Sequence, residues 1–503
     1  MNLTELFGST APTPSTGLAV ARHDSHDPDI TGLSADSRAV RPGFLFAALQ
    51  GTRADGRHFA ADAAARGAAA ILTDDPAKLD LAESERHRIA ILASDNPQRC
   101  LALLAARFYG RQPHTIAAVT GTNGKTSVVH FARSIWTELG RRAASLGTLG
   151  LVTATARRPG ALTTPDPVAL HRDLADLAKS GIEHVAIEAS SHGLAQFRLD
   201  GLSVAAAAFT NLTRDHLDYH GDMAAYRAAK ERLFSALLVA GGTAVLNADS
   251  PEFPRLTALC REHGHRILAY GGDPYAELRL AAAVPQQAGQ QLTLDILGQR
   301  HELVLPLAGG FQAMNALAAL GLVIATGSPA APAIAALARL AGVPGRVQLV
   351  AELDCGAAVY VDYAHTPDAL ATVLAALRPH VKGRLGVVFG AGGDRDPGKR
   401  PLMGEAAARF ADRVYVTDDN PRNESPKHIR RAILAGAPGA IEIGDRRAAI
   451  AAAMSDLAAG DVLVVAGKGH ETGQIVGTKT LPFDDAAIVR ELAEGHRPTK
   501  AAS

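Results

Sequence analysis

Residues 121–126 (GTNGKT) combine the residue types that bind nucleotide phosphates. A backbone that turns at two glycines into a helix points its N–H groups at phosphate, and Lys125 would neutralise the β- and γ-oxygens. The Thr126 hydroxyl would ligate Mg²⁺. The usual pattern G-x-x-x-x-G-K-[ST] has its first glycine where this chain has Val119, so the loop is a shortened one. An ordinary glycine-rich turn capped by Thr126 is the alternative.

Candidate metal ligands follow two further strand-like runs. Glu188 lies in the run HVAIEAS, and the segment TNLTRDHLDYHG (210–221) contains His216 among two aspartates and a second histidine. Carboxylates suit Mg²⁺, and a neutral imidazole could serve a second metal ion. Structural roles for these side chains are the alternatives. Lys230, in MAAYRAAKERLF, has on its own the pattern of a solvated lysine on an amphipathic helix.

These residues need strands and helices that bring them together, and the hydrophobic pattern predicts such elements. Apolar strand-like runs alternate with alanine-rich helical stretches through most of the chain, which is typical of α/β domains with largely parallel sheets. In such sheets ligands gather at the carboxyl ends of the strands. Polar residues end the four runs of the middle segment: TIAAVT (115–120), HVAIEAS (184–190), AAAAFTNL (205–212) and GTAVLNAD (242–249).

The length of the chain and the positions of glycine and proline predict three domains. Its 503 residues exceed one ordinary core. Glycine and proline interrupt the pattern at YGRQPHT and again at LAGVPGRVQLV. We therefore expect domains at 1–112, 113–344 and 345–503. Within the second, the amphipathic stretch 277–305 is expected to form antiparallel strands.

Composition excludes several classes of protein. Lys and Arg together number 51, as do Asp and Glu, so no net positive charge favours nucleic acid. The three cysteines are far apart and form no C-x-x-C pair, so neither a disulfide framework nor a zinc site is indicated. The start MNLTELFGST does not have the pattern of a secretory signal, and the apolar runs are too short to span a bilayer. We expect a cytoplasmic protein that binds neither nucleic acid nor membrane.

Eight motifs occur in the order found in the Mur ligases: GTNGKTS, TTPDP, EASSHGLAQFRL, TNLTRDHLDYHG, DYAHTPDAL, GAGGDRDPGKRPLM, DDNPRNE and AGKGHE. The resemblance extends over about residues 30 to 475. Most narrowly, the set resembles the members that add meso-2,6-diaminopimelate to UDP-N-acetylmuramoyl-L-alanyl-D-glutamate. The shortened loop 121–126 resembles the ATP loop of this family.

The resemblance implies a three-domain α/β enzyme. Its N-terminal domain would bind the UDP-linked substrate, its central domain would bind ATP on a P-loop-type, mostly parallel sheet, and its C-terminal, Rossmann-like domain would bind the amino acid. The implied activity is that of an ATP-dependent amide ligase in peptidoglycan precursor synthesis, which forms an acyl phosphate that the incoming amine attacks. The expected ligands are Mg²⁺, ATP, UDP-MurNAc-L-Ala-D-Glu and meso-diaminopimelate, and the protein is expected to be a monomer.

The family pattern also assigns catalytic and ATP-binding residues. Catalysis would involve Lys125, Lys230 and His216, with Lys230 carbamylated so that it becomes a carboxylate-like metal ligand. A carbamate forms on a neutral amine, so Lys230 should lie where its positive charge is disfavoured. The implied metal ligands are Thr126, Glu188, His216 and the Lys230 carbamate. The implied ATP-binding residues are Gly121, Thr122, Asn123, Gly124, Lys125, Thr126, Ser127, Asn315 and Arg346.

Six residues match the family's contacts to the UDP-linked acceptor: Ser37, Thr163, Thr164, Ser190, Gln196 and Arg198. Arg198 supplies a positive charge for a carboxylate or phosphate of the acceptor. One position departs from the pattern, because Leu162 stands where an asparagine usually precedes the two threonines. A hydrogen-bond donor is lost there.

The motif DNPR (419–422) resembles the family's pattern for diaminopimelate. Diaminopimelate differs from lysine by a second carboxylate on its far carbon, so an arginine fork suits it and is misplaced for the ammonium end of lysine. Glu471 would pair with the distal ammonium. Without the resemblance, DNPR is simply a turn with proline after asparagine. The implied diaminopimelate-binding residues are Arg395, Asp419, Asn420, Pro421, Arg422, Gly467 and Glu471.

Three other interpretations stay open at this point. The same reaction with L-lysine is the nearest, although lysine-adding relatives differ at DNPR. Folylpolyglutamate synthetase shares the implied fold and ATP chemistry, but would not be expected to have the N-terminal segment DSRAVRPG (36–43). A P-loop NTPase acting as a switch or motor needs only the loop and the metal ligands, and leaves DNPR and GKGHE unexplained.

Overall fold

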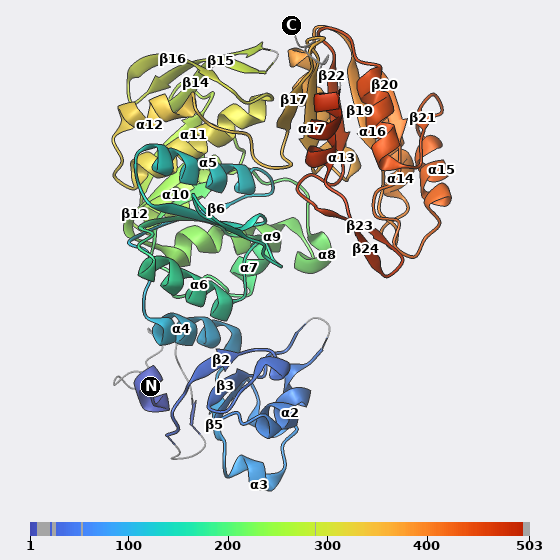
Figure 1. Ribbon diagram of the computed structural model, residues 1–503. Coiled ribbons are helices and arrows are strands. Elements are labelled where there is room, and N and C mark those ends of the chain that lie inside the picture. Colours follow the sequence, from blue (N-terminus) through green and yellow to red (C-terminus); the bar gives the residue numbers. More distant parts are fainter. Residues whose placement is uncertain (8–20, 23–26, 52–53, 287, 496–503) are drawn as a thin grey trace, which may run out of the picture. The chain divides into compact units, whose positions relative to one another are not determined.

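The computed structural model describes residues 1–7, 21–22, 27–51, 54–286 and 288–495 (Figure 1). The chain divides into two units. The first comprises Met1–Leu268 and Gly321–Ser328, and the second comprises Ala269–Leu320 and Pro329–Ser503. Strand β13 (Arg266–Gly271) and helix α11 (Gly310–Ala325) each run from one unit into the other. In the described part of the chain, no helix is both long enough and apolar enough to cross a membrane.

The first unit starts with a five-stranded sheet in the order β1-β5-β4-β3-β2. Strands β2 to β5 are parallel, and β1 is antiparallel to β5. The last helix of this segment begins at Pro97, where the Asn96 side chain accepts from the N–H of Arg99, and is capped after Tyr109 by Gly110 with φ +69°. The elements are α1 (Leu3–Phe7), β1 (Ala21–Arg22), β2 (Gly32–Ser34), β3 (Phe44–Ala47), α2 (Ala60–Ala65), β4 (Ala70–Thr73), α3 (Glu83–Arg86), β5 (Ala90–Ala93) and α4 (Pro97–Tyr109).

The rest of the first unit is built on a sheet in the order β13-β12-β11-β6-β10-β7-β8-β9. From β12 to β7 in that order, each strand is parallel to the next. All six residues of β6 are buried, which explains its uninterrupted apolar sequence. The elements are β6 (Thr115–Thr120), α5 (Lys125–Glu138), β7 (Ala143–Gly147), β8 (Gly150–Val152), β9 (Arg157–Arg158), α6 (Pro167–Lys179), β10 (His184–Glu188), α7 (Ser191–Ala195), β11 (Val204–Phe209), α8 (Leu217–His220), α9 (Met223–Arg232), β12 (Leu238–Asn247) and α10 (Phe253–Glu262).

The second unit begins with three antiparallel strands, as the amphipathic pattern of 277–305 predicts. In β15 the buried residues alternate with half-buried ones, as expected of a sheet with one covered face. These elements are β14 (Leu278–Gln286), β15 (Gly289–Ile296), β16 (Gln299–Leu305) and α12 (Ala330–Leu337).

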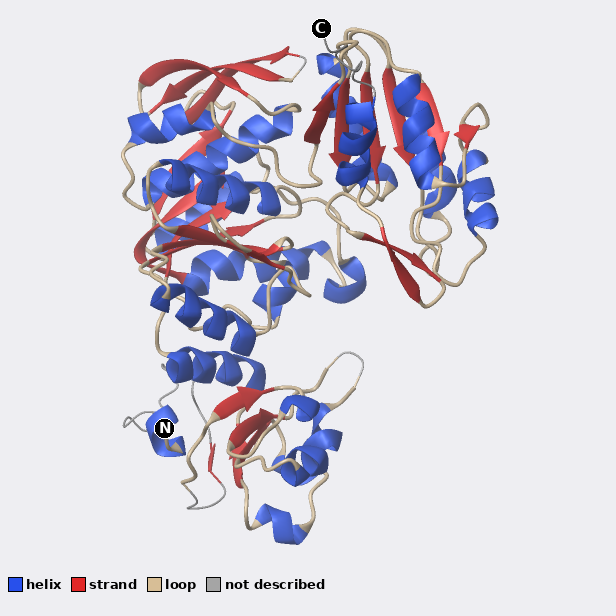
Figure 2. Cartoon of the chain, in the orientation of Figure 1, coloured by secondary structure: helices blue, strands red, loops and turns tan. Residues whose placement is uncertain are grey.

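The remainder of the second unit is a six-stranded sheet in the order β17-β18-β22-β19-β20-β21, with a separate two-stranded hairpin (Figure 2). The sheet is parallel except for β17. The elements are β17 (Gln348–Glu352), β18 (Ala358–Asp362), α13 (Pro367–Leu377), β19 (Leu385–Phe389), α14 (Lys399–Phe410), β20 (Arg413–Val416), α15 (Pro426–Leu434), β21 (Ile441–Glu442), α16 (Arg446–Ser455), β22 (Val462–Ala466), β23 (Gly473–Val476), β24 (Lys479–Pro482) and α17 (Asp485–Gly495).

Helices cover both faces of this six-stranded sheet. Val387 of β19 belongs to a core that also contains Leu374 of α13, whereas the next residue, Val388, belongs to a core with Ile450 of α16. Successive strand residues thus point into two separate cores, so the strand is apolar at every position. The predicted α/β fold with largely parallel sheets is confirmed, and the predicted domain boundaries stay predictions.

Candidate active site

The loop between β6 and α5 is held in a tight turn that depends on glycine. Gly121 and Gly124 have φ angles of +146° and +88°, which L side chains rarely adopt. A Cβ atom at Gly121 would also lie 1.9 Å from Thr210 Oγ1. The N–H of Thr122 donates to Asn211 O at 2.8 Å. The segment after β11 therefore fixes the loop in front of the helix, the arrangement that binds phosphate.

Lys125 begins α5 and folds back over this loop. Its Nζ donates to Gly121 O and to Thr122 O, both at 2.8 Å. The Asn123 N–H donates to Asn211 Oδ1 at 2.9 Å. The loop thus has a positive charge beside the N-terminus of α5, and the predicted residues 121–127 form one continuous turn into that helix.

Glu188 lies beside this loop because β10 and β6 are parallel neighbours, with Glu188 paired to Val119. Its carboxylate is buried, with only 1% of the residue exposed. Oε2 accepts from Thr126 Oγ1 at 3.0 Å, and Oε1 accepts from the N–H of Thr148 at 2.7 Å. A Cβ at Gly147 would lie 2.1 Å from Oε1, so glycine makes room for the carboxylate. A carboxylate and a hydroxyl therefore face each other at the phosphate loop.

The predicted acceptor residues continue from Glu188 on its other side. Thr164 Oγ1 donates to the main-chain oxygen of Glu188 at 2.7 Å and lies 2.9 Å from Ser190 Oγ. Thr163 Oγ1 lies 3.1 Å from Thr148 Oγ1, and Thr148 Oγ1 also donates to Glu188 Oε2 at 3.2 Å. Glu188 thus contacts the phosphate loop through its side chain and Thr164 through its backbone, and its side chain is linked to Thr163 through Thr148.

Arg198 and Gln196 extend the same network. Arg198 Nη1 donates to Thr164 O at 2.7 Å, and its Nε donates to Gln196 Oε1 at 3.1 Å. Gln196 Nε2 donates in turn to the hydroxyl of Tyr219, on α8, at 3.0 Å. Burial lowers the pKa of Arg198 from its usual value. A half-buried guanidinium in this position suits an anionic ligand.

Ser37 and Leu162 stand apart from this network. Ser37 is buried in the N-terminal segment, where it hydrogen-bonds the Asp62 carboxylate and lowers its pKa. Leu162, the departure from the family pattern, has an exposed side chain. The structure brings five of the six predicted acceptor residues together and places Ser37 with the N-terminal sheet.

Lys230 lies at the phosphate loop although it is more than 100 residues away in sequence. Its Nζ donates to Gly121 O at 2.8 Å and lies 4.4 Å from the centroid of the Tyr226 ring. Burial, and next the positive charge of Lys125, lower the pKa of Lys230 to about 6. Its amine is therefore mostly neutral at pH 7, which is the environment expected of this lysine.

His216 precedes α8 with φ +54°, in the left-handed region. Its Nε2 lies 3.5 Å from Asp215 Oδ2, and its ring packs edge-on against His192 with centroids 4.8 Å apart. Among the residues that the structure describes, no three His, Cys, Asp or Glu side chains gather as a ready metal site. The predicted ligand set contains only two such side chains, Glu188 and His216, so this finding does not bear on it.

Three loops of the second unit meet because β22, β19 and β20 are parallel neighbours. They follow the carboxyl ends of these strands and contain GAGGDRD, DNPR and AGKGHE. The N–H of Gly393 donates to Asn420 O at 2.9 Å. Asn420 Nδ2 donates to Glu471 Oε2 at 3.0 Å. A Cβ at Gly467 would lie 3.6 Å from Asp419 Oδ2. Arg395 is exposed on the loop that contains GAGGDRD.

Arg422 has φ +51°, a conformation in which an arginine is strained. Its Nη1 donates to Gly393 O at 2.7 Å. Its N–H donates to Ile475 O at 3.1 Å, and its own carbonyl accepts from the N–H of Gly477 at 2.7 Å. The β23–β24 hairpin therefore holds the arginine in the conformation that brings its side chain over the GAGG loop.

Asn315 and Arg346, which the family pattern assigns to ATP, belong to the second unit. Asn315 is buried on α11 and donates through Nδ2 to Gln312 Oε1 at 3.2 Å. Gln312 Nε2 donates to Arg346 O at 3.1 Å. The Arg346 guanidinium lies 4.8 Å from the Tyr363 ring centroid, and its buried Nε has no acceptor among the described residues. Both residues thus belong to one local cluster.

Sequence reasoning missed Lys468 and Gln474. Lys468 is fully buried in the AGKGHE loop, and its Nζ donates to Asn420 Oδ1 at 2.9 Å. Gln474 Nε2 donates to Asp419 O at 2.7 Å. For Lys468, the available signal was its place directly after a buried strand, between Gly467 and Glu471. For Gln474 the sequence contains no comparable signal.

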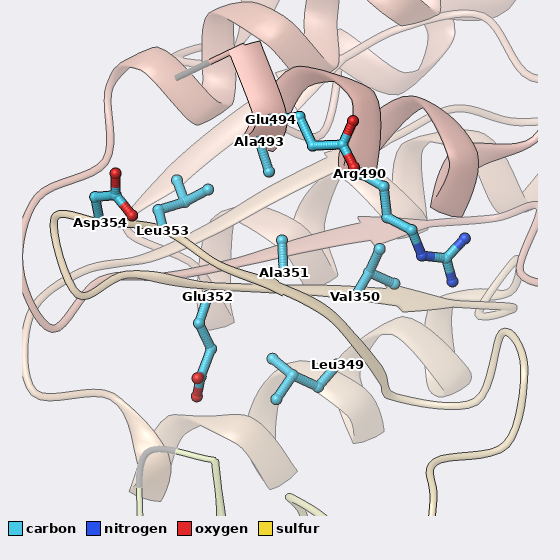
Figure 3. A pocket seen from close by; sticks show the side chains of 9 residues that line it. All are labelled: Leu349, Val350, Ala351, Glu352, Leu353, Asp354, Arg490, Ala493 and Glu494. Atoms are coloured by element: carbon cyan, nitrogen blue, oxygen red, sulfur yellow. The ribbon is translucent and has the colours of Figure 1, made fainter. Parts of the chain in front are cut away.

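A groove of about 440 Å³ lies between β17 and α17 in the second unit (Figure 3). None of the predicted site residues lines it. Its lining residues are Leu349, Val350, Ala351, Glu352, Leu353, Asp354, Arg490, Ala493 and Glu494.

Three family models match the chain along most of its length. They are the Mur ligase family, catalytic domain, at residues 29–109; the Mur ligase middle domain at 119–323; and the Mur ligase, glutamate ligase domain at 345–469.

Full-length relatives are also similar. A UDP-N-acetylmuramoyl-L-alanyl-D-glutamate–2,6-diaminopimelate ligase of Caulobacter vibrioides is 54% identical over 475 residues, covering 93% of this chain and 96% of the relative. A ligase of the same name from Bradyrhizobium diazoefficiens is 52% identical over 497 residues, covering 98% and 99%. A solved structure of such a ligase has 36% identity and a TM-score of 0.71, covering 93% of this chain and 96% of that chain. The chain belongs to the Mur ligase family.

Proposed function

We propose that this protein is an ATP-dependent amide ligase that adds meso-2,6-diaminopimelate to UDP-N-acetylmuramoyl-L-alanyl-D-glutamate in peptidoglycan precursor synthesis. Relatives that are more than half identical over nearly the whole chain bear the name of that ligase. The observation that best supports the proposal is the position of Glu188, which contacts Thr126 of the phosphate loop and Thr164 of the acceptor network. Phosphoryl transfer from ATP to an acceptor carboxylate needs that adjacency.

The phosphate loop would bind the nucleotide. Its backbone N–H groups and the N-terminus of α5 favour phosphate, and Lys125 would turn from the loop carbonyls toward the γ-phosphate. We infer that Asn315 and Arg346 contribute to ATP binding. The buried Nε of Arg346, which has no acceptor among the residues described, suits an anionic ligand.

The donor set fits Mg²⁺, which prefers oxygen ligands. Thr126 and Glu188 would hold one ion, and His216 would assist with a second. Bound Mg²⁺ would neutralise charge on the γ-phosphate and the acceptor carboxylate. Lys230 fits the set as a carbamate, which would supply an anionic oxygen ligand. Its neutral state at pH 7 allows that modification.

The acceptor would lie along Thr163, Thr164, Ser190, Gln196 and Arg198, with Ser37 at its uridine end. The reaction forms a bond between a carboxylate oxygen of the acceptor and the γ-phosphorus, and breaks the bond to ADP. The incoming amine then forms the amide and releases phosphate. The contribution of the protein is to position two anions and neutralise their charge.

Residues of the second unit would select the amino acid. Arg422 would form a fork with the distal carboxylate of diaminopimelate, and Glu471 would accept from its ammonium group. Asp419 Oδ1 is buried without a hydrogen-bond partner among the described residues, although Lys468 Nζ lies 3.3 Å away. A buried carboxylate oxygen in this state suits a further donor, such as an ammonium group.

Phosphate release from purified protein tests the proposal. The protein is incubated with Mg²⁺, ATP and UDP-MurNAc-L-Ala-D-Glu, in parallel with meso-diaminopimelate, L-lysine or no amino acid. Release that depends on diaminopimelate supports the proposal. Equal release with lysine would indicate a ligase of the same kind that does not select diaminopimelate over lysine. Release in every tube would indicate a simple NTPase.

Substitution of Arg422 tests the selectivity argument. Arg422→Lys keeps the charge but loses the fork, so kcat/KM for diaminopimelate should fall by about tenfold or more, the effect of one charge-assisted hydrogen bond. Arg413→Lys, the same change at an exposed position of β20, is the control. Unchanged kcat/KM in Arg422→Lys would contradict a role for the arginine in selectivity.

A further inference from the structure

Lys468 is a fully buried lysine with a complete set of partners. Its Nζ donates to Asn420 Oδ1 at 2.9 Å and to Gly473 O at 2.8 Å, and lies 3.3 Å from Asp419 Oδ1. A buried ammonium is tolerated only when paired and hydrogen-bonded, because its desolvation is costly. All these partners lie in the loops that contain DNPR and AGKGHE or at the start of β23, so Lys468 joins these three segments.

Lys468 also determines how the Asn420 amide points. Asn420 Oδ1 accepts from Lys468 Nζ and from the N–H of Ile475 at 2.9 Å. Both partners are donors, so this atom must be the oxygen, and the amide nitrogen must face the other way. There it donates to Glu471 Oε2 at 3.0 Å. The ammonium of Lys468 therefore reaches Glu471 through the Asn420 amide, and its Nζ also lies 3.7 Å from Glu471 Oε2.

The hairpin formed by β23 and β24 holds the other side of the same loop. Gln474 Nε2 donates to Asp419 O at 2.7 Å, and Ile475 O accepts from the N–H of Arg422 at 3.1 Å. Because Lys468 also bonds Gly473 at the start of β23, it anchors the hairpin to the loop whose arginine has φ +51°. Glu471 and Arg422 are thus held by one buried centre.

We propose that Lys468 is a positioning residue for the amino-acid substrate. It acts through Asn420 and the hairpin to hold the Glu471 carboxylate and the Arg422 guanidinium at a spacing that fits an ammonium and a carboxylate on the distal carbon of diaminopimelate. The inference rests on the proposed function. Lys468 itself does not touch the substrate, because none of its surface is exposed. Its loss should affect binding of the amino acid and leave binding of ATP and acceptor intact.

Steady-state kinetics of Lys468→Met test this inference. Methionine keeps much of the side-chain volume but removes the three donors. We expect KM for diaminopimelate to rise by about tenfold or more, as when a buried polar group loses its partner, while KM for ATP and for UDP-MurNAc-L-Ala-D-Glu stays within about twofold of wild type. The preference for diaminopimelate over lysine should fall together with that change. Lys479→Met, the same change at an exposed position of the same hairpin, is the matched control.

A second variant covers the case in which Lys468→Met does not fold, as judged by its melting curve. Gln474→Met removes one hydrogen bond between the hairpin and Asp419, and should also raise KM for diaminopimelate selectively, by a smaller factor. Unchanged KM for diaminopimelate, or an equal rise in all three KM values, in the folded variant would overturn the inference. Wild-type protein without diaminopimelate-dependent phosphate release would overturn the proposed function instead, so the two failures are distinguishable.

Discussion

At the scale of single residues, Lys230 lies in an environment that disfavours the positive charge a lysine usually carries. Only 2% of the residue is exposed, and its Nζ has a backbone carbonyl and a tyrosine ring as neighbours. Burial and the charge of Lys125 lower its pKa to about 6. A neutral amine can react with CO₂: an N–C bond forms, a proton is lost, and the product is an anionic oxygen donor. At the phosphate loop that donor suits a metal ion.

Replacement of Lys230 should therefore lower the rate of catalysis much more than it weakens the binding of ATP. We expect Lys230→Met to lower kcat by about 100-fold or more, the effect of removing one preorganised charge-stabilising group, with KM for ATP changed little. Phosphate release measures kcat. Protein equilibrated with ¹³C-bicarbonate should show a carbamate resonance that the variant lacks.

Lys179→Met is the control for this experiment, since Lys179 is exposed at the end of α6 in the same unit. It should keep wild-type kcat. A Lys230→Met protein with wild-type kcat would rule out the carbamate role.

At the scale of elements, the proposed amino-acid site depends on how closely three loops approach one another. A Cβ at Gly393 would lie 1.9 Å from Pro421 O, and one at Gly390 would lie 2.4 Å from Thr417 O. The loop after β19 therefore packs directly on the backbone of the loop after β20. The glycines of GAGGDRD are needed for this contact rather than for an unusual φ angle.

Gly393→Ala should separate these two loops. We expect the free energy of unfolding to fall by about 1–3 kcal/mol, typical of overpacking, and KM for diaminopimelate to rise because Arg422 Nη1 loses its fixed acceptor, Gly393 O. Urea unfolding and phosphate release measure the two effects. Gly439→Ala, at a glycine whose Cβ would meet nothing within 4 Å, should change neither quantity. Equal behaviour of the two variants would show that the loops have room to relax.

At the scale of the whole molecule, buried neutral histidines make stability depend on pH. Burial lowers the pKa of His130 to about 3 and that of His171 to about 4. In the unfolded chain both would titrate near 6.5. As pH falls from about 6.5 toward 4, the unfolded state therefore binds protons that the folded state does not, and the free energy of unfolding decreases.

His171→Gln should reduce this dependence. One histidine contributes a slope of up to about 1.4 kcal/mol per pH unit between its two pKa values. We expect the free energy of unfolding of the variant, measured by urea at several pH values, to fall less steeply between pH 6.5 and 4 than that of wild type. His87→Gln, at an exposed histidine, is the control and should keep the wild-type slope. An identical slope in His171→Gln would mean that His171 is protonated in the folded protein.

Much of this architecture could be predicted from the sequence because it depends on local patterns. The buried strands β6, β10, β11 and β12 and the antiparallel stretch 277–305 lie where their hydrophobic periodicity predicts them. The phosphate loop could also be recognised from its sequence, by its two glycines and Lys125. The order of eight motifs predicted the Mur ligase family, and the comparisons confirmed it.

The elements, the family and the types of residue at the site follow from local patterns in the chain. Which of those residues meet depends on how the elements pack. Lys230 looks like a surface lysine in its helix, and its burial depends on the contact of its Nζ with Gly121 O, in the loop after β6. The sequence contains no signal for Gln474 and only the position of Lys468 after a buried strand, because their role comes from hydrogen bonds across loops that follow different strands. Hydrophobic periodicity and motif spacing encode local conformation, whereas desolvation and long-range hydrogen bonds exist only after the chain has folded.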